Sequence, residues 1–428
     1  MNITIEKPPS GGEVKAVASK SHAHRMLICA ALSDGQSYIE CAERSDDIDA
    51  TAGCLEGLGA KIVHDGNGFS VSPIKLPLSG VKVSQVCGES GATLRFMLPV
   101  CCALGVTAEF ITVGSLRHRP TSPLLEQLAE NGCEIKMSDG AISCSGKLRS
   151  GNFLLQGNVS SQFISGLLLA LPLLEQESVI NIEGKVESMP YVTLTHDALG
   201  LFGVNVSRRG AHSTDGGAVF LIPGGQQYRT PGKIKVEGDW SNSATWLSAG
   251  VLGGSGVTCS GLNLGTSQGD MAILRQLGRF GAVVEYEGDK VSVKTTKTQS
   301  IQVDATHTPD LVPVLALIAS VSQGETLINN AGRLRLKESD RLHAVTSTLN
   351  TLGADVTEKQ DALIIRGKES LQGGTVTSFG DHRIVMMAAI ASIVCKNPVT
   401  IEAVESVNKS YPGFFEDFKK LGGEISIS

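Results

Sequence analysis

The sequence predicts an α/β fold built from six similar units, because two patterns recur in step along its 428 residues. The first is a short motif, in which glycine stands between a large residue and a small or apolar one. The second is a nearly all-apolar segment near the start of each unit. Internal repetition at a fixed period identifies the architecture before any local detail does, so the fold class follows from these two patterns.

The glycine motif marks the predicted end of an amphipathic helix in each unit. Glycine directly after a helical run is typical of the left-handed C′ position. The residues after it alternate between polar and apolar, as in 134–137 and 283–286, which predicts strands. The copies lie roughly seventy residues apart. They are Leu58-Gly59-Ala60, Asn131-Gly132-Cys133, Phe202-Gly203-Val204, Phe280-Gly281-Ala282, Leu352-Gly353-Ala354 and Leu421-Gly422-Gly423.

The apolar segments predict helices that are buried on every side. They span 26–32, 94–104, 163–174, 244–252, 311–321 and 384–394. A β-rich stretch follows each one, at 37–41, 107–113, 178–182, 256–259, 325–329 and 398–403. The predicted unit is therefore a buried helix, a strand, an amphipathic helix, a strand and a hairpin. Two globules of three units each fit the usual size of a single hydrophobic core.

Composition and charge exclude several classes of protein. The hydrophobic fraction of 41% and the charged fraction of 19% are typical of a globular chain. The net charge of −6 disfavours a nucleic-acid-binding protein, although local groups of cations remain compatible with anionic ligands. We find no signal or transit peptide, and apolar runs such as 163–174 are too short to span a bilayer. We therefore expect a soluble, cytoplasmic protein.

Cysteine spacing disfavours zinc and redox sites. The ten cysteines include no C-x-x-C pair, and most lie in apolar stretches. We expect buried free thiols that pack as small apolar side chains.

Polar and cationic residues gather where the predicted buried helices begin. Good N-cap residues account for Ser, Thr, Asp and Gly at these places. They do not account for the cations, because a cation at a helix N-terminus opposes the macrodipole and a bound anion removes that conflict. The cations are Lys20, Arg25, Arg95 and Arg383. The sequence therefore predicts anion binding at the segments 19–25, 88–95, 159–162, 239–243, 306–310 and 380–383.

Two further segments are rich in basic residues. The first, 114–120, carries Arg117, His118 and Arg119. In the second, 333–341, Lys337 and Arg341 are spaced so that a helix would place both on one side. Taken alone, the second segment is explained more simply as a solvated helix with ion pairs. Patterns of the forms G-x-x-x-x-G-K-[ST], H-E-x-x-H and G-x-S-x-G are absent, so ATP-dependent phosphoryl transfer, zinc protease chemistry and serine hydrolase chemistry lack support.

Together these segments resemble those of the 5-enolpyruvylshikimate-3-phosphate synthase family of enolpyruvyl transferases. The resemblance covers essentially the whole chain, and its most specific parts are 337–342 and 381–383. It implies a two-domain inside-out α/β barrel built from six βαβαββ-type repeats, three per domain. It also implies a split domain of residues 1–18 plus 238–428 on the phosphoenolpyruvate side, and an inserted domain of residues 19–237 on the shikimate 3-phosphate side.

The resemblance implies a reaction and a set of residues. The enolpyruvyl group of phosphoenolpyruvate would pass to the 5-hydroxyl of shikimate 3-phosphate by addition and elimination through a tetrahedral intermediate, in aromatic amino acid (chorismate) biosynthesis. The implied catalytic residues are Asp310, Glu338 and Lys20. The implied phosphoenolpyruvate-binding residues are Lys20, Gly91, Arg119, Gln162, Arg341, Arg383 and Lys409. The implied shikimate-3-phosphate-binding residues are Ser21, Arg25, Ser160, Ser161, Gln162, Ser188, Tyr191, Asp310 and Lys337.

The resemblance also bears on partners and inhibitors. We expect a monomer that acts on two small molecules, with no cofactor, no metal, no nucleic acid and no membrane partner. The resemblance implies a family that is the target of the herbicide glyphosate, and the residues leave open whether this chain binds it. Five residues depart from the usual family pattern at the phosphoenolpyruvate site, namely Glu89, Ser90, Ala92, Phe96 and Arg333. A carboxylate at Glu89 would repel an anionic substrate unless it is paired or turned away.

Three other functions fit parts of the pattern. An enolpyruvyl transferase that acts on a UDP-sugar would use similar anion clusters, but that family typically carries a cysteine in the loop near Arg119, where 115–119 has none. A non-catalytic anion-binding scaffold would need the cations but not Asp310 and Glu338. A phosphate-end cyclase acting on RNA is disfavoured by the acidic net charge and the aromatic fraction of 4%.

Overall fold

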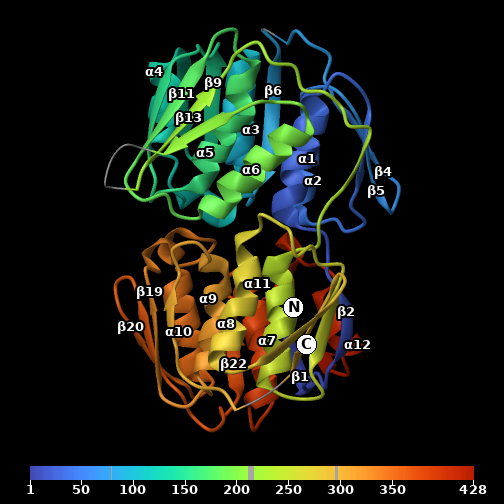
Figure 1. Cartoon of the computed structure of the whole chain (residues 1–428), viewed down its shortest axis with the longest axis vertical. Coiled ribbons are helices and arrows are strands. Elements are labelled where there is room, and N and C mark those ends of the chain that lie inside the picture. The colour runs from blue at the N-terminus through green and yellow to red at the C-terminus, as the bar shows by residue number, and fades with distance from the viewer. Residues whose placement is uncertain (79, 211–215, 295–296) are drawn as a thin grey trace. The chain divides into compact units, whose positions relative to one another are not determined.

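The computed structural model describes residues 1–78, 80–210, 216–294 and 297–428 (Figure 1). It divides into two compact units. Unit 1 consists of Met1–Ser19 and Glu237–Ser428, and unit 2 of Lys20–Val236. The division predicted from the sequence put Ser19 and Glu237 in the other unit. The Ser19 N–H donates to the Glu237 carbonyl at 2.7 Å, and Ala18 forms a β-bridge with Gly238, so the two connecting segments pair with each other.

Unit 2 contains six α-helices within its described residues (Figure 1). They are α1 (Lys20–Leu32), α2 (Asp46–Gly57), α3 (Gly91–Leu104), α4 (Leu124–Glu130), α5 (Ser161–Ala170) and α6 (Met189–Leu201), with short 3-10 helices η1 (Gly114–His118) and η2 (Leu171–Leu173). Its strands are β3 (Ser37–Glu40), β4 (Lys61–His64), β5 (Gly68–Ser72), β6 (Lys82–Gly88), β7 (Thr107–Thr112), β8 (Cys133–Ser138), β9 (Ala141–Gly146), β10 (Asn152–Gln156), β11 (Ser178–Glu183), β12 (Ser207–Gly210), β13 (Ala218–Ile222) and β14 (Lys233–Lys235).

Unit 1 begins with strands β1 (Ile3–Lys7) and β2 (Gly12–Lys15) and resumes after residue 236. Its helices are α7 (Trp240–Leu252), η3 (Gly269–Ala272), α8 (Ile273–Phe280), η4 (Pro309–Leu311), α9 (Val312–Ala319), η5 (Gly332–Leu336), α10 (Arg341–Thr351), α11 (His382–Ala391), η6 (Ser392–Val394), η7 (Val404–Lys409) and α12 (Phe414–Lys420). Its other strands are β15 (Val257–Ser260), β16 (Val283–Glu287), β17 (Lys290–Lys294), β18 (Gln302–Asp304), β19 (Glu325–Asn329), β20 (Asp355–Glu358), β21 (Leu363–Arg366), β22 (Gly374–Thr377), β23 (Val399–Glu402) and β24 (Glu424–Ile427).

The described strands form six four-stranded sheets, three in each unit. In every sheet the first pair is parallel and the other two pairs are antiparallel. The orders are β14-β3-β5-β4, β6-β7-β9-β8 and β10-β11-β13-β12 in unit 2, and β2-β15-β17-β16, β18-β19-β21-β20 and β22-β23-β1-β24 in unit 1. The repetition predicted from the sequence is therefore present as one sheet topology used six times.

Strands distant in the sequence complete several of these sheets. β1 lies between β23 and β24, and β2 pairs with β15. In unit 2, β14 pairs with β3 at the other end of that unit. Each unit is thus closed by pairing between segments from its two sequence ends.

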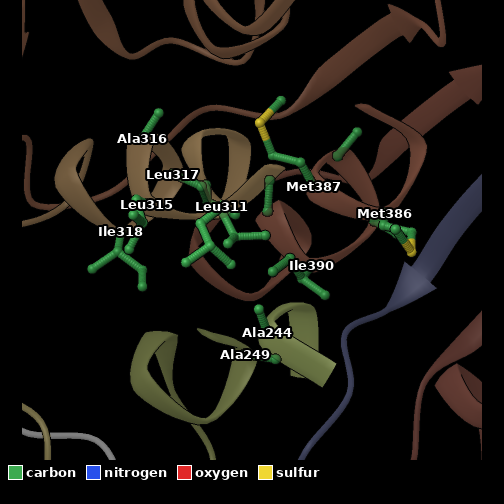
Figure 2. Close-up of a cluster of buried hydrophobic side chains, with 14 of the residues drawn as sticks. Ala244, Ala249, Leu311, Leu315, Ala316, Leu317, Ile318, Met386, Met387 and Ile390 are labelled. Carbon is green, nitrogen blue, oxygen red and sulfur yellow. The ribbon is translucent and has the colours of Figure 1, made fainter. Parts of the chain in front are cut away.

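The predicted buried helices are confirmed as α1, α3, α5, α7, α9 and α11, whose side chains are almost all buried. Figure 2 shows the centre of unit 1, where Ala244 of α7, Leu315 of α9 and Met387 of α11 belong to one apolar cluster. The six motif glycines have φ between 72° and 104°, which confirms the left-handed C′ position. Apolar packing inside each unit therefore fixes the ends of its buried helices in space, and these ends carry the polar residues.

Nine of the ten cysteines are buried and Cys395 is partly exposed, and all ten are free thiols, as predicted. Among the described residues, no helix combines the length and the apolar character that crossing a membrane requires.

Candidate active site

Arg25 of α1 contacts two other helices of unit 2, α3 and α5. Its Nη2 donates to Ser165 Oγ of α5 at 3.3 Å, and its Cζ lies 5.0 Å from the centre of the Phe96 ring of α3. Phe96, one of the departures from the family pattern, therefore packs against Arg25 as a cation–π partner.

The guanidinium of Arg25 is buried among neutral groups. Its Nε donates to Thr195 Oγ1 at 2.7 Å, Nη1 to the Ser21 carbonyl at 2.6 Å, and Nη2 to the Tyr191 carbonyl at 2.9 Å. Burial lowers the pKa of Arg25 to about 10. Within the described residues no carboxylate pairs with this cation, so it attracts an anion strongly.

Lys20 begins α1 and is paired in this structure. Its Nζ lies 2.8 Å from Asp47 Oδ2, and both side chains are largely buried. Asp47 belongs to the acidic first turn of α2, which also contains Asp46 and Asp49. Asp47 could not be recognised from the sequence, because acidic residues in a first helical turn are expected for the macrodipole alone.

Arg119 lies against the start of α3. A Cβ atom on Gly91, the first residue of α3, would stand 2.7 Å from Arg119 Nη1 and 2.9 Å from its Cζ. The Arg119 guanidinium can therefore occupy this position only because residue 91 has no side chain.

Arg95 links the segment that contains Arg119 to α5. Its Nη1 donates to Gln162 Oε1 at 2.6 Å, and its Nη2 donates to the Pro120 carbonyl at 2.9 Å. From the sequence, Arg95 is a cation near a predicted helix start with no assigned role. The structure shows that it holds both Gln162 and the residue that follows Arg119.

For the phosphoenolpyruvate site that the resemblance implies, we expect Gly91→Ala to raise the KM roughly tenfold, because the new methyl group displaces the Arg119 guanidinium and one charge-assisted contact is worth about 1.5–3 kcal/mol. The KM for shikimate 3-phosphate should change by less than about twofold. Initial rates with each substrate varied in turn measure this, and Gly200→Ala, where a Cβ meets no neighbour within 4 Å, is the control. Equal increases in both KM values would contradict this placement of Arg119.

The serines assigned to this unit lie at helix starts. Ser160 is the N-cap of α5 and accepts from the Gln162 N–H at 3.3 Å, and Ser161 is the first residue of that helix. Ser188 precedes α6 with φ 55°, a left-handed conformation that is rare for a residue other than glycine. Strained backbone of this kind is concentrated at functional sites. Its neighbour Tyr191 accepts from Arg25 through its backbone carbonyl.

Glu89 is held by the loop before Arg119. Ser115 Oγ donates to Glu89 Oε2 at 3.4 Å. A Cβ atom on Gly114, whose φ is 54°, would stand 2.4 Å from Glu89 Cδ, so the carboxylate rests directly on this glycine. The Glu89 carboxylate is therefore held against the segment Gly114–Ser115.

Asp310 is the centre of the charged residues in unit 1. Its Oδ1 lies 2.6 Å from Arg341 Nη1 and 3.2 Å from Lys337 Nζ. Burial alone would raise the pKa of Asp310, but Lys337, Arg341 and Arg383 outweigh burial and hold it well below the usual range. Asp310 is therefore ionised, and its Oδ1 contacts two cations.

The interpretation of 333–341 as a solvated charged helix is wrong. Residues 332–336 form the 3-10 helix η5, Lys337 is extended, and α10 begins only at Arg341. Lys337 and Arg341 nevertheless converge, because both contact Asp310. A tertiary contact, and not the helical spacing, brings these two cations together.

Arg341 is 2% exposed and joins two carboxylates. Its Nε and Nη2 donate to the two oxygens of Asp381 at 2.9 and 3.1 Å, and its Nη1 reaches Asp310. Asp381 also caps α11 by accepting from the Arg383 N–H, and it accepts from Ser339 Oγ at 3.0 Å. Asp381 is therefore the residue that fixes Arg341 in its orientation.

Glu338 is paired with a histidine. Its Oε2 lies 2.8 Å from His382 Nδ1. Among the described residues, Glu338, Asp381 and His382 also place potential metal ligands within 4.8 Å of one another. Both oxygens of Asp381 already accept from Arg341, so an ion held by all three residues would have to compete with that guanidinium.

Arg383 and Lys409 complete the predicted set. Both terminal nitrogens of Arg383 donate to Ser241, Nη1 to its carbonyl at 2.7 Å and Nη2 to its hydroxyl. Arg383 is buried and, like Arg25 in the other unit, its hydrogen-bond partners among the described residues are neutral. Lys409 Nζ donates to the Gly380 carbonyl at 2.8 Å, in the turn before α11. The predicted residues of unit 1 therefore form one group around Asp310 and α11.

Comparisons with known proteins agree on one family. The family model described as EPSP synthase (3-phosphoshikimate 1-carboxyvinyltransferase) matches residues 6–418. A protein of Clostridium kluyveri named 3-phosphoshikimate 1-carboxyvinyltransferase is 45% identical over 427 residues, covering 99% of this chain and 98% of the relative. One of the same name from Clostridium acetobutylicum is 43% identical over 419 residues, covering 97% and 96%. A solved EPSP synthase from Acinetobacter baumannii matches with a TM-score of 0.80 at 23% identity, covering 100% of both chains.

Proposed function

The chain belongs to the EPSP synthase family, and we propose that the residues described above carry out the reaction of that family. It is an enzyme that transfers the enolpyruvyl group of phosphoenolpyruvate to shikimate 3-phosphate, in aromatic amino acid biosynthesis. The observation that best supports our assignment of residues is one buried arginine in each unit with neutral hydrogen-bond partners, Arg25 and Arg383. Such cations have their charge balanced when an anionic substrate binds.

In this proposal two sets of residues bind the two substrates. Phosphoenolpyruvate is held by Lys20, Gly91, Arg119, Gln162, Arg341, Arg383 and Lys409. Shikimate 3-phosphate is held by Ser21, Arg25, Ser160, Ser161, Gln162, Ser188, Tyr191, Asp310 and Lys337. The guanidinium groups among them suit carboxylate and phosphate because each presents a fork of donors to two oxygens.

The reaction requires two proton transfers in its addition stage and one in its elimination stage. In the addition, the 5-hydroxyl attacks the middle carbon of phosphoenolpyruvate and loses its proton, while the methylene carbon gains one. In the elimination, the new methyl group loses a proton and phosphate leaves. We assign the hydroxyl proton to Asp310, which is ionised, and the carbon proton to Glu338 with its partner His382 or to Lys20. The surrounding cations stabilise the leaving phosphate.

We further propose that each unit is an inside-out α/β barrel of three βαβαββ-type repeats. The six sheets of identical topology support this. Unit 1 is the phosphoenolpyruvate side and unit 2 the shikimate 3-phosphate side in the proposal. We also propose a monomeric enzyme in the cytoplasm, because ten free thiols suit a reducing compartment. Glyphosate competes with phosphoenolpyruvate in this proposal.

Phosphate release from phosphoenolpyruvate tests the acceptor. The purified protein is incubated with shikimate 3-phosphate, with a UDP-sugar, or with no acceptor. We expect release with shikimate 3-phosphate alone. Release with the UDP-sugar would keep the chemistry and change the acceptor. Binding of both anions without release would point to a non-catalytic scaffold.

We expect kcat/KM for shikimate 3-phosphate to fall as the pH rises through about 8. Burial lowers the pKa of Lys337 to about 8, with Arg341 and Arg333 acting in the same direction and Asp310 opposing them. The protonated cation binds the acceptor, so its loss weakens binding, and kcat/KM reports groups of the free enzyme. Profiles measured from about pH 7 to 10 should be flatter for Lys337→Arg, because arginine stays charged. Identical profiles for the two proteins would contradict the role of Lys337.

A further inference from the structure

Four buried polar side chains form a hydrogen-bonded chain between α1, α2 and α3. His24 Nδ1 lies 2.7 Å from Thr51 Oγ1, and Thr51 Oγ1 lies 2.7 Å from Thr93 Oγ1. Thr93 Oγ1 donates to Ser90 Oγ at 2.8 Å. All four residues are at most 1% exposed. The chain therefore runs, shielded from water, from the middle of α1 to the N-cap of α3.

The direction of donation along this chain follows from the number of protons available. Each hydroxyl has one proton to donate. Thr93 Oγ1 has two acceptors within reach, Ser90 Oγ at 2.8 Å and the Asp47 carbonyl at 3.4 Å, and it gives its proton to the nearer one. Thr51 must therefore be the donor in its contact with Thr93. Thr51 has then used its own proton, so His24 must donate from Nδ1. The geometry thus assigns the Nδ1–H tautomer to His24.

The surroundings of His24 agree with this assignment. Burial, together with the charges of Lys20 and Arg25, lowers the pKa of His24 well below its usual value, so the ring is neutral. Its Nε2 is buried and has no hydrogen-bond partner in the described part of the chain. A buried acceptor without a partner is more readily tolerated than a buried N–H without one. The unprotonated atom of the ring is therefore the one left without a partner.

The other end of the chain carries an unused donor. Ser90 Oγ accepts from both the hydroxyl and the backbone N–H of Thr93, at 2.8 and 3.3 Å. Its own proton has no acceptor among the residues that the structure describes. Ser90 directly precedes Gly91, against which Arg119 lies. An O–H donor is thus left one residue before the glycine that accommodates the Arg119 guanidinium, at the start of a helix, where the macrodipole also favours an anion.

We propose that Ser90 donates this proton to an anionic oxygen of phosphoenolpyruvate, and that His24, Thr51 and Thr93 are positioning residues that keep Ser90 available as a donor. This inference rests on the function proposed above. A second contact supports the coupling to the substrate site, because Thr93 Oγ1 also lies 3.4 Å from the carbonyl of Asp47, the residue that pairs with Lys20.

Thr51→Val is the most selective test. Valine keeps the shape of threonine and removes the middle hydroxyl, and it leaves the contacts between Thr93 and Ser90 intact. Thr93 and Ser90 are then no longer oriented by His24. The Ser90 hydroxyl therefore spends part of its time donating to Thr93 Oγ1 instead of to the substrate. We expect the KM for phosphoenolpyruvate to rise roughly fivefold, with kcat and the KM for shikimate 3-phosphate within about twofold of the wild-type values.

Thr348→Val is the matched control. Thr348 is buried in α10 of the other unit, and its hydroxyl has no hydrogen-bond partner among the described residues. The same change there should leave both KM values unchanged. A similar rise in the KM for phosphoenolpyruvate in both variants would overturn the inference.

Substitutions of His24 separate positioning from packing. His24→Asn can place an amide N–H near the position of Nδ1, so its KM for phosphoenolpyruvate should stay within about twofold of wild type. His24→Leu fills space without donating and should resemble Thr51→Val. If both His24 variants lose stability and raise both KM values equally, His24 has a packing role and the inference fails.

The double variant Thr51→Val/Ser90→Ala shows whether the effect passes through Ser90. We expect Thr51→Val to have no further effect on the KM for phosphoenolpyruvate once the Ser90 hydroxyl is gone. A full additional effect would exclude Ser90 as the donor. Titration calorimetry of phosphoenolpyruvate binding to each variant gives the same comparison without turnover. A wild-type protein that binds phosphoenolpyruvate but releases no phosphate with shikimate 3-phosphate would refute the proposed function, whereas equal binding by wild type and Thr51→Val would refute this inference.

Discussion

Replacing Asp310 with asparagine is expected to lower kcat by about 10²- to 10⁴-fold, the usual contribution of one general acid–base group. Asparagine has nearly the same shape but cannot take up the hydroxyl proton. Binding of both substrates should persist, because the change removes a negative charge that lies 2.6 Å from Arg341 and 3.2 Å from Lys337. Those cations then attract anions at least as strongly as before.

Steady-state rates and calorimetric binding of each substrate measure the two effects separately. Asp355→Asn is a suitable control, because Asp355 is a half-exposed carboxylate in the same unit, 4.0 Å from Arg366. Its kcat should match the wild type. If Asp310→Asn loses binding together with turnover while the fold is kept, Asp310 acts by positioning the substrate and not by moving a proton.

Replacing Arg341 with methionine is expected to destabilise the protein by about 3–5 kcal/mol, because it leaves buried carboxylates without their countercharge. Asp381 is 0% exposed and loses both of its contacts with Arg341, and Asp310 loses its closest cation. Calorimetric unfolding should show the loss in the transition that belongs to unit 1. Arg366→Met, which breaks an exposed ion pair with Glu325, should change stability by less than about 1 kcal/mol.

A second substitution distinguishes this cause from lost packing. Asp381→Asn keeps the cap of α11, because an amide oxygen can still accept from the Arg383 N–H. The double variant Arg341→Met/Asp381→Asn should therefore recover a large part of the lost stability. If it is as unstable as Arg341→Met, the uncompensated charge of Asp381 is not the cause.

Features governed by local physics could be predicted from the sequence. The six glycines end helices because a left-handed residue is required there, and this requirement is visible at each position alone. The apolar segments became buried helices for the same reason, since their composition leaves no polar face. Arg25 and Arg383 could likewise be recognised from the sequence as candidates for anion binding, because cations near a helix N-terminus oppose the macrodipole.

Features that depend on partners from other elements could not be predicted. Lys337 and Arg341 meet at Asp310, which lies in a separate segment, and the helical spacing suggested the wrong reason. Asp47 appeared to be an ordinary first-turn acid until the structure placed it on Lys20. Thr51 and Thr93 appeared to be unremarkable helix residues, because a chain of hydroxyls between three helices leaves no periodic signal.

The pairing of β1 between β23 and β24 has a consequence for how the protein is made. The ribosome produces β1 before the whole of unit 2 and the rest of unit 1, and it produces β24 last. Residues 20–236 emerge as one uninterrupted stretch, so unit 2 can fold while translation continues. The nascent chain meanwhile carries β1 with both edges unpaired, and apolar residues such as Ile3 and Ile5 stay exposed until the last strands arrive. Unit 1 is therefore expected to complete its sheet of β22, β23, β1 and β24 only after β24 has been synthesised, and so later than unit 2.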